Sequence, residues 1–178
     1  MAAKKKVAKK TTRKKSVKKA TISSQADLKA GKDVDQKAKK TLLKAMKNKG
    51  RDALEPFKLA DKVLQADREV ALAAVKEGGW ALKYADKALT SDREVVLTAV
   101  QSEGGALQFA DKSLKADHAI VREAVEQNGN ALQYAAKALK ADMGIVIEAV
   151  INNPDALIYA SKALQKNKHI QALAEHNR

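Results

Sequence analysis

The chain of 178 residues contains no cysteine, two prolines and few aromatic residues, which make up 3% of the total. The absence of cysteine excludes disulfides and thiolate metal sites and is typical of a reducing compartment. Long hydrophobic runs are also lacking, since the most apolar one, Met143 to Ile151, is interrupted by Glu148. It falls far short of the ~20 residues that a membrane span needs. No apolar stretch follows the basic amino terminus, so we expect no secretory signal peptide.

What the sequence does contain is a 25-residue repeat. When the copies are aligned, equivalent positions form columns of similar residues. Three columns show the repeat: Leu82, Leu107, Leu132 and Leu157; Tyr84, Phe109, Tyr134 and Tyr159; Leu89, Leu114, Leu139 and Leu164. A more divergent copy lies upstream, with Phe57, Leu59 and Leu64 in these columns. Self-similarity at this period indicates stacked units that share one core. We predict an all-α fold: a right-handed α-solenoid of about five helix-pair repeats, preceded by a disordered basic tail.

The predicted organisation has three parts. Residues 1–33 form the lysine-rich tail, residues 34–55 a basic capping helix with a linker, and residues 56–178 the helical repeat domain. The repeat units are predicted at 56–80, 81–105, 106–130, 131–155 and 156–178.

Within each unit the spacing of apolar residues predicts two helices of roughly nine to eleven residues, too short to persist alone in water. In one unit they span Ala81–Leu89 and Arg93–Ser102. An N-cap column precedes the second helix: Asp67, Asp92, Asp117, Asp142 and Asn167. Glycines are predicted to end that helix in the left-handed conformation: Gly79, Gly104 and Gly129, with Pro154 in the fourth copy. The valine column (Val75, Val100, Val125, Val150) becomes Glu175, so residues 171–178 are predicted to form a polar end cap.

The stretch LKYADKALTSDREVVLTAV, from Leu82 to Val100, with a GxAL sequence after it, resembles the helical repeats of a bacterial domain of unknown function. The resemblance extends over residues 56–170, in several columns and several copies. It implies an all-helical repeat fold and carries no catalytic or binding residue onto this sequence.

The net charge of +14 is distributed unevenly. Residues 1–26 carry ten Lys or Arg and no acidic residue, and residues 27–52 contribute a further +5. Residues 53–178 are close to neutral, at −1. This asymmetry is typical of an arm that binds nucleic acid or another anionic surface.

The tail supplies ten candidate nucleic-acid-binding residues: Lys4, Lys5, Lys6, Lys9, Lys10, Arg13, Lys14, Lys15, Lys18 and Lys19. With so many like charges and so few apolar groups, we expect the tail to be disordered. Its composition resembles that of the lysine-rich tails of linker-histone-like proteins. Base readout is not expected, because lysines dominate and no groove-reading helix is evident.

A helix is predicted from Gln36 to about Asn48, between an N-cap at Asp35 and Gly50 beyond its end. Its apolar stripe consists of Ala38, Leu42, Leu43 and Met46, and we expect it to cap the first repeat. Lysines cover much of the rest: Lys37, Lys39, Lys40, Lys44 and Lys47. Four of them complete the candidate binding residues: Lys37, Lys40, Lys44 and Lys47.

Three other columns have a structural interpretation, two of them with a functional alternative. The aromatic column is predicted to pack between adjacent units, and the alternative is base stacking. A lysine column is interpreted as a solvated face, or as an extension of the anion-binding surface: Lys62, Lys87, Lys112, Lys137 and Lys162. The Asp column is assigned to helix capping, because stacked units lie ~10 Å apart, too far for carboxylates to share a metal ion.

Catalytic patterns are missing. His118, His169 and His176 lack the spacing and carboxylate neighbours of a zinc site. No serine has a histidine placed to activate it, and no glycine loop is suited to phosphate. We expect no enzymatic activity, metal, cofactor or small-molecule substrate.

These patterns predict a non-enzymatic, sequence-independent nucleic-acid-binding protein that uses its tail, with DNA preferred to RNA and the repeats as an interaction surface. The alternative is a protein-interaction scaffold that uses the solenoid surface, with the tail secondary. Membrane binding is not expected, because the tail lacks an aromatic or acyl anchor. We expect the protein in the cytoplasm, associated with the nucleoid if bacterial.

Overall fold

The computed structural model describes residues 36–47 and 54–178, which belong to one compact unit. The predicted tail and the caps proposed at Asp35 and Gly50 lie outside the described residues. Helices and no strand occur in the part described, which confirms the all-α solenoid. None of the helices within these two ranges is long and apolar enough to cross a membrane.

The α-helices are α1 (Gln36–Lys47), α2 (Leu54–Lys58), α3 (Lys62–Gln65), α4 (Arg68–Glu77), α5 (Arg93–Ser102), α6 (His118–Gln127), α7 (Met143–Asn152), α8 (Lys162–Gln165) and α9 (Lys168–His176). Shorter 3-10 helices alternate with them: η2 (Gly79–Tyr84), η3 (Leu89–Ser91), η4 (Gly104–Phe109), η5 (Leu114–Ala116), η6 (Gly129–Tyr134), η7 (Leu139–Ala141) and η8 (Pro154–Tyr159).

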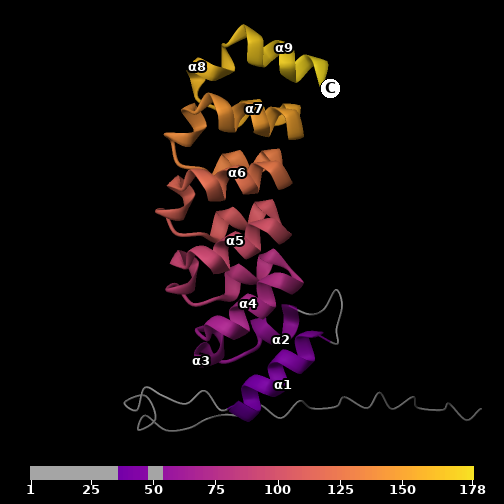
Figure 1. The fold of residues 1–178 in the computed structure, drawn as a ribbon, viewed down its shortest axis with the longest axis vertical. Coiled ribbons are helices and arrows are strands. Elements are labelled where there is room, and N and C mark those ends of the chain that lie inside the picture. The colour runs from indigo at the N-terminus through magenta and orange to yellow at the C-terminus, as the bar shows by residue number, and fades with distance from the viewer. Residues whose placement is uncertain (1–35, 48–53) are drawn as a thin grey trace, which may run out of the picture. The chain divides into compact units, whose positions relative to one another are not determined.

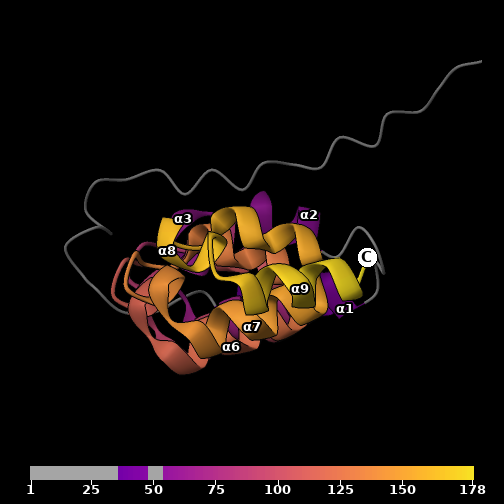
Figure 2. The ribbon, with the colours of Figure 1, turned by 90° about the horizontal axis from the view of Figure 1, so that it is seen from above.

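The units stack in chain order, with the long helices α4 to α7 lying one above the other (Figure 1). Along the stack, α6, α7 and α9 lie on one side, and the short helices α2, α3 and α8 lie on the other (Figure 2). The core runs between these two layers through all the units and joins them into one continuous cluster. Each unit therefore buries its apolar face against its neighbours, as a solenoid requires.

The long helix of each unit forms as predicted. The Asp or Asn before it accepts a hydrogen bond from a backbone amide of the first turn, in α4 to α7 and in α9. The valine column is fully buried at Val75, Val100, Val125 and Val150. Glu175, in the same column of α9, is exposed, as are His176, Asn177 and Arg178. The predicted caps and polar end are thus confirmed.

The first half of each unit differs from the prediction. Ala81–Leu89 is not one α-helix: it contains the end of η2, an irregular turn and the start of η3. Ala85, which follows η2, has an extended backbone with φ −66° and ψ 154°. This turn lets the Asp86 amide donate a 3.0 Å hydrogen bond to the Gln65 carbonyl of the preceding unit.

The same bond recurs in the next three units, from Asp111 to Thr90 (2.9 Å), from Ala136 to Lys115 (2.8 Å) and from Ser161 to Lys140 (2.7 Å). A backbone bond between units has replaced the continuation of a helix within the unit. The good helix formers in this segment are therefore overridden by tertiary structure.

The glycines of the repeat have another role than the predicted one. The residue that ends α5 is Glu103, in an extended conformation with φ −146°. Gly104 follows it and is buried at the start of η4, where a Cβ would overlap the carbonyl oxygen of Ala124 in the next unit. Gly79 and Gly129 make the same approach to Ala99 and Ala149. They are needed because two backbones touch, and not for a left-handed conformation.

Helix α1 has the predicted bounds and covers the first unit. Leu42 and Met46 are buried, and Ala38 and Leu43 pack against the core. Its neighbours are α4 and α2. α1 therefore takes the place that a long helix of a preceding unit would occupy.

Candidate nucleic-acid interface

The four candidate residues on α1, Lys37, Lys40, Lys44 and Lys47, all have exposed side chains. Because Leu42 and Met46 point into the core, the helix presents these lysines on its outer side. The ten candidates of the tail lie outside the described residues. The structure thus places the α1 lysines on one exposed helix face and leaves the larger part of the predicted site to binding experiments.

Lys39 does not belong to the outward face to which its spacing assigned it. Its Nζ lies 2.9 Å from Asp67 Oδ2 and 2.7 Å from Glu69 Oε2, and its side chain is only 13% exposed. These two ion pairs raise the pKa of Lys39. Lys39 therefore links α1 to α4 through ion pairs and is not available to bind a phosphate.

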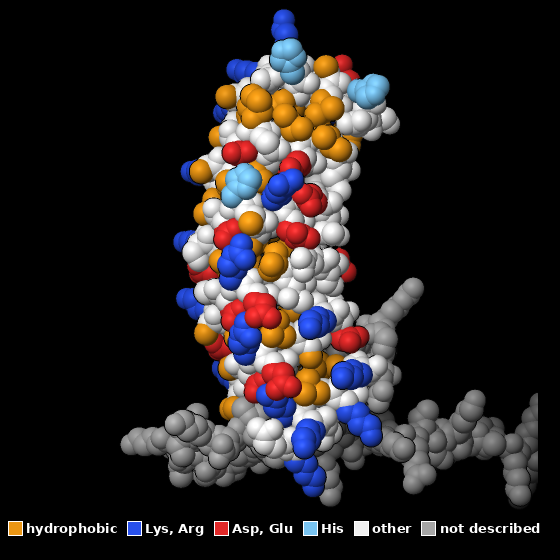
Figure 3. Space-filling view, in the orientation of Figure 1, with side chains coloured by type: hydrophobic (Ala, Val, Ile, Leu, Met, Phe, Trp, Pro, Cys, Tyr) orange, Lys and Arg blue, Asp and Glu red, His pale blue; other side chains and the backbone are white. Residues whose placement is uncertain are grey.

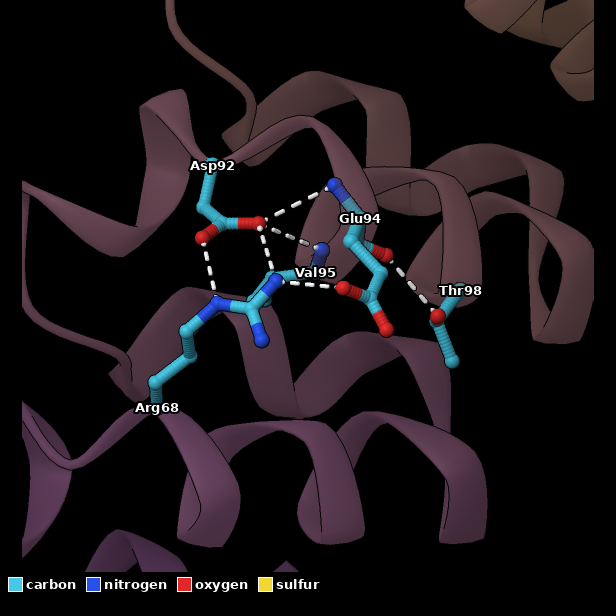
Figure 4. Close-up of polar contacts among 5 residues, drawn as sticks. All are labelled: Arg68, Asp92, Glu94, Val95 and Thr98. Carbon is cyan, nitrogen blue, oxygen red and sulfur yellow. Dashed lines mark hydrogen bonds and ion pairs between the residues drawn. The ribbon is translucent and has the colours of Figure 1, made fainter.

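The contact made by Lys39 is the first step of a ladder that runs up the stack. Arg68, at the start of α4, donates from Nε to Asp92 Oδ2 over 2.7 Å and also pairs with Glu94 (Figure 4). Arg93, one unit later, donates from Nε to Asp117 Oδ2 over 3.3 Å. In each case a basic residue reaches the N-cap carboxylate of the next long helix. One carboxylate thereby caps its own helix and joins it to the unit below.

Further up, Arg122 continues the pairing and contacts Glu126 of its own helix and Glu148 of α7, each over 3.0 Å. Basic and acidic side chains are accordingly interspersed over the face seen in Figure 3. Much of the acidic charge of the repeat units is therefore already paired with basic residues, most of them in the preceding unit or in α1.

The pKa values of the ladder carboxylates follow from these contacts. The hydrogen bond from Arg68 lowers the pKa of Asp92, and the backbone amides of Val95 and Glu94 act in the same direction. Partial burial of Asp117 opposes its ionisation, but the Ile120 amide and Arg93 outweigh it and lower the pKa. A carboxylate whose pKa is lower in the folded than in the unfolded state stabilises the fold above about pH 4 and loses that contribution as the pH falls.

Replacing Asp92 by asparagine is expected to retain the cap, because asparagine caps well, and to remove the ion pair. We expect Asp92→Asn to lower the free energy of unfolding by about 0.2–1 kcal/mol at neutral pH, the range for exposed pairs. The difference from the wild type should shrink as the pH falls below about 4 and vanish below the lowered pKa of Asp92 in the folded state, where both states bind the proton. Urea unfolding of both proteins at a series of pH values measures this difference in the free energy of unfolding. The loss in the double variant Arg68→Gln/Asp92→Asn should be smaller than the sum of the two single losses, although Arg68→Gln also removes the pair with Glu94. Fully additive losses would contradict the pairing of Arg68 with Asp92.

The aromatic column packs as predicted in four of its five positions. Tyr84, Phe109, Tyr134 and Tyr159 are half-buried and lie against the core. Leu59, its divergent first member, is 76% exposed.

The lysine column is exposed in all five units, at Lys62, Lys87, Lys112, Lys137 and Lys162. This agrees with a solvated face, and its alternative role in anion binding stays a prediction. Within residues 36–47 and 54–178, no cluster of His, Asp and Glu could hold a metal ion.

The geometry described above repeats at the period of the sequence. The sequence matches a family described as a domain of unknown function, DUF4116, in two adjacent stretches, residues 39–90 and 92–140. The chain belongs to the DUF4116 family. The first DUF4116 match begins at Lys39 inside α1, which agrees with the place of α1 in the stack. Comparison with curated proteins and with solved structures found no match. The linker-histone resemblance of the tail stays a prediction.

Sequence reasoning overlooked one conspicuous residue of this DUF4116 chain. Trp80 is the single tryptophan, and Gly105, Asn130 and Asp155 occupy the same column in the following units. The residue type at this position differs in every unit, and a lone tryptophan among them is a signal that the sequence already contained. The structure places Trp80 at the surface, 42% exposed.

Proposed function

We propose that this protein binds nucleic acid without sequence specificity and without enzymatic activity, with DNA preferred to RNA. In this proposal the ten basic residues of the tail neutralise phosphates, and Lys40, Lys44 and Lys47 of α1 add to them. The repeat units serve as an interaction surface. The proposed location is the cytoplasm, with the nucleoid as the site of action if the protein is bacterial.

The observation that carries the proposal is the separation of charge along the chain: residues 1–52 hold the whole excess, and residues 53–178 sum to −1. The internal pairing of the stack supports it. Asp67, Asp92 and Asp117 already contact Lys39, Arg68 and Arg93. An acidic surface that could compete with phosphate for the tail is thereby reduced, and the exposed α1 lysines extend the same positive charge.

The proposal is tested by fluorescence anisotropy with random-sequence duplex DNA at increasing salt. The full chain is compared with a variant of the same length in which all ten basic tail residues are glutamine. If most of these residues contact phosphates, log affinity should fall against log salt with a slope of up to about −9. Wild-type affinity should drop by about 10³–10⁵ between roughly 50 and 200 mM salt. The glutamine variant should lose most of its affinity and of this slope.

A matched control carries glutamine at the five exposed lysines of the repeat column, from Lys62 to Lys162. It should bind nearly as the wild type does if the tail is responsible. Equal affinity and slope in the tail variant would refute the proposal. The same titration with duplex RNA measures the preference for DNA.

A specific surface feature favours the second candidate function, a protein-interaction scaffold. On α7, Met143, Ile147 and Ile151 recur at helical spacing, and Met143 and Ile151 are 51% and 57% exposed. Figure 3 shows an apolar area towards this end of the stack. Pull-downs with residues 53–178 separate the two functions. A partner retained by this tail-less body, and lost when Ile151 is replaced by glutamine, would favour the scaffold.

A further inference from the structure

A groove of about 470 Å³ opens on the side of the short helices, where the first three units meet. α2, η2 and η4 supply its walls, and Trp80, Tyr84 and Phe109 line it together with Lys58 and Lys83. The volume is in the range of about 300–1,000 Å³ that small-molecule sites occupy. Aromatic rings and cations meet here in one concave surface.

Two residues of one variable column, Trp80 and Gly105, shape the aromatic wall. Trp80 and Phe109 are in contact, with ring centroids 5.8 Å apart and an interplanar angle of 73°. Gly105 occupies the column position of Trp80 in the next unit, and a Cβ there would lie 3.3 Å from the Trp80 ring. The later units have Asn130 and Asp155 at this position. The missing side chain of Gly105 leaves room for the Trp80 ring.

A structural role in the core does not account for Trp80. Trp80 is 42% exposed, whereas the largest apolar side chains of the core, such as Phe57 and Leu82, are fully buried. A large aromatic residue that stays partly exposed at the wall of a groove is a candidate for stacking on a ligand.

The charges at the groove select the kind of ligand. Lys58 Nζ and Lys83 Nζ lie 5.9 and 5.8 Å from the centroid of the Tyr84 ring. Glu55 also lines the groove, but it pairs with Lys58 over 3.0 Å. The charge of these three residues is therefore +1, which disfavours a methylated ammonium group, the ligand that aromatic cages bind. It favours a flat aromatic group attached to an anion.

We propose that this groove binds an unpaired nucleotide of single-stranded nucleic acid, with the base stacked on Trp80 and the phosphate held by Lys83. The inference rests on the proposed function, since the tail would bring the nucleic acid to the stack. A base inside a duplex is already stacked and paired and cannot enter. Stacking on aromatic rings beside a basic surface is how proteins bind single strands without reading their sequence. The groove would thus give a preference for single-stranded regions that the tail alone does not provide.

Trp80 is itself the probe for this proposal, because the full chain contains no other tryptophan. Titration with a short thymidine oligonucleotide should quench its fluorescence, and titration with a duplex should not. By anisotropy, Trp80→Leu should weaken binding of the oligonucleotide by about 5- to 150-fold, the range expected for losing one base–aromatic stack. Duplex binding should not change. Lys83→Gln should reduce the slope of log affinity on log salt by about 0.7 for the single strand.

Two matched controls lie outside the groove. Tyr134→Leu removes a half-buried aromatic residue two units above Tyr84, and Lys87→Gln removes an exposed lysine of the same unit as Lys83. Both should bind the oligonucleotide as the wild type does. Far-UV circular dichroism establishes that each variant is folded. Should Trp80→Leu fail to fold, the quenching of the wild type and the Lys83→Gln titration still decide the question.

The outcomes separate this inference from the function on which it rests. If duplex binding depends on the tail, while the oligonucleotide neither quenches Trp80 nor responds to Trp80→Leu and Lys83→Gln, the groove proposal fails and the proposed function stands. If the full chain binds neither nucleic acid, both fail. Quenching by a trimethyl-lysine peptide in place of the oligonucleotide would identify a cation site and overturn the inference.

Discussion

Replacing Gly104 by alanine is expected to lower the free energy of unfolding by about 3 kcal/mol, the upper end of the range for overpacking. The added Cβ would overlap the Ala124 carbonyl oxygen and lie 3.1 Å from the amide nitrogen of Asn128. Both atoms belong to backbone, so no rotation of a side chain can make room, and the two units must move apart. The midpoint of thermal unfolding should fall by about 6–12 °C.

The control for this prediction is the same substitution at Gly144, in the first turn of α7. Gly144 is exposed, and a Cβ there would have the side chain of Asp142 as its nearest neighbour, at 3.3 Å. Alanine at this position should stabilise the protein slightly or leave it unchanged, since it reduces the freedom of the unfolded chain. Both variants are compared by circular dichroism during heating. If Gly104→Ala unfolds at the temperature of the wild type, the close approach of the backbones is not what the glycine serves.

Gly104 also illustrates where prediction from the sequence ends. Its position at the end of a periodic segment correctly indicates that α5 stops there. The sequence does not reveal why glycine is needed, because the atoms that exclude a side chain come from the next unit. The N-cap role of Asp92 could be predicted, since an N-cap and the amides it binds lie within three residues of one another. Its ion pair with Arg68 could not, because that contact joins residues 24 positions apart.

The difference between contacts within a segment and contacts between units also explains why the helix predicted for the first half of each unit was wrong. Helix propensity and apolar spacing act within a segment, and both favour a helix from Ala81 to Leu89. The extended conformation at Ala85 is stabilised from outside the segment, by the bond between the Asp86 amide and the Gln65 carbonyl. The groove at Trp80 could not be predicted from the sequence for the same reason, because residues of three units contribute to it.

The division of charge between tail and stack has a structural consequence. The ladder from Lys39 to Arg93 uses N-cap carboxylates as partners, so the contacts that hold units in register also neutralise the stack. If the tail binds nucleic acid as proposed, repeat units whose charges sum to only −1 can lie close to that nucleic acid, and Trp80 can then reach an unpaired base. The proposed function and the groove inference thus assign separate tasks to the two parts, with affinity from the tail and preference for single strands from the groove.

Replacing Leu107 by alanine is expected to destabilise the protein more than the same change at Leu157, the last member of its column. Leu107 is fully buried, with units packed on both sides, and a buried Leu→Ala change costs about 2–5 kcal/mol. The midpoint of thermal unfolding should fall by about 4–20 °C. Leu157, the same column position in the last unit, is only half-buried.

Leu157→Ala should therefore cost less than Leu107→Ala, and Leu59→Ala, at a site that is 76% exposed, should have almost no effect. Circular dichroism and urea unfolding of the three variants test this order. In a solenoid, stability is the sum of each unit and its interfaces with its neighbours, so a central unit contributes through two interfaces and the last unit through one. Equal losses at Leu107 and Leu157 would mean that the units do not depend on stacking for their stability, and the glycine contacts and the arginine ladder would then be without energetic consequence.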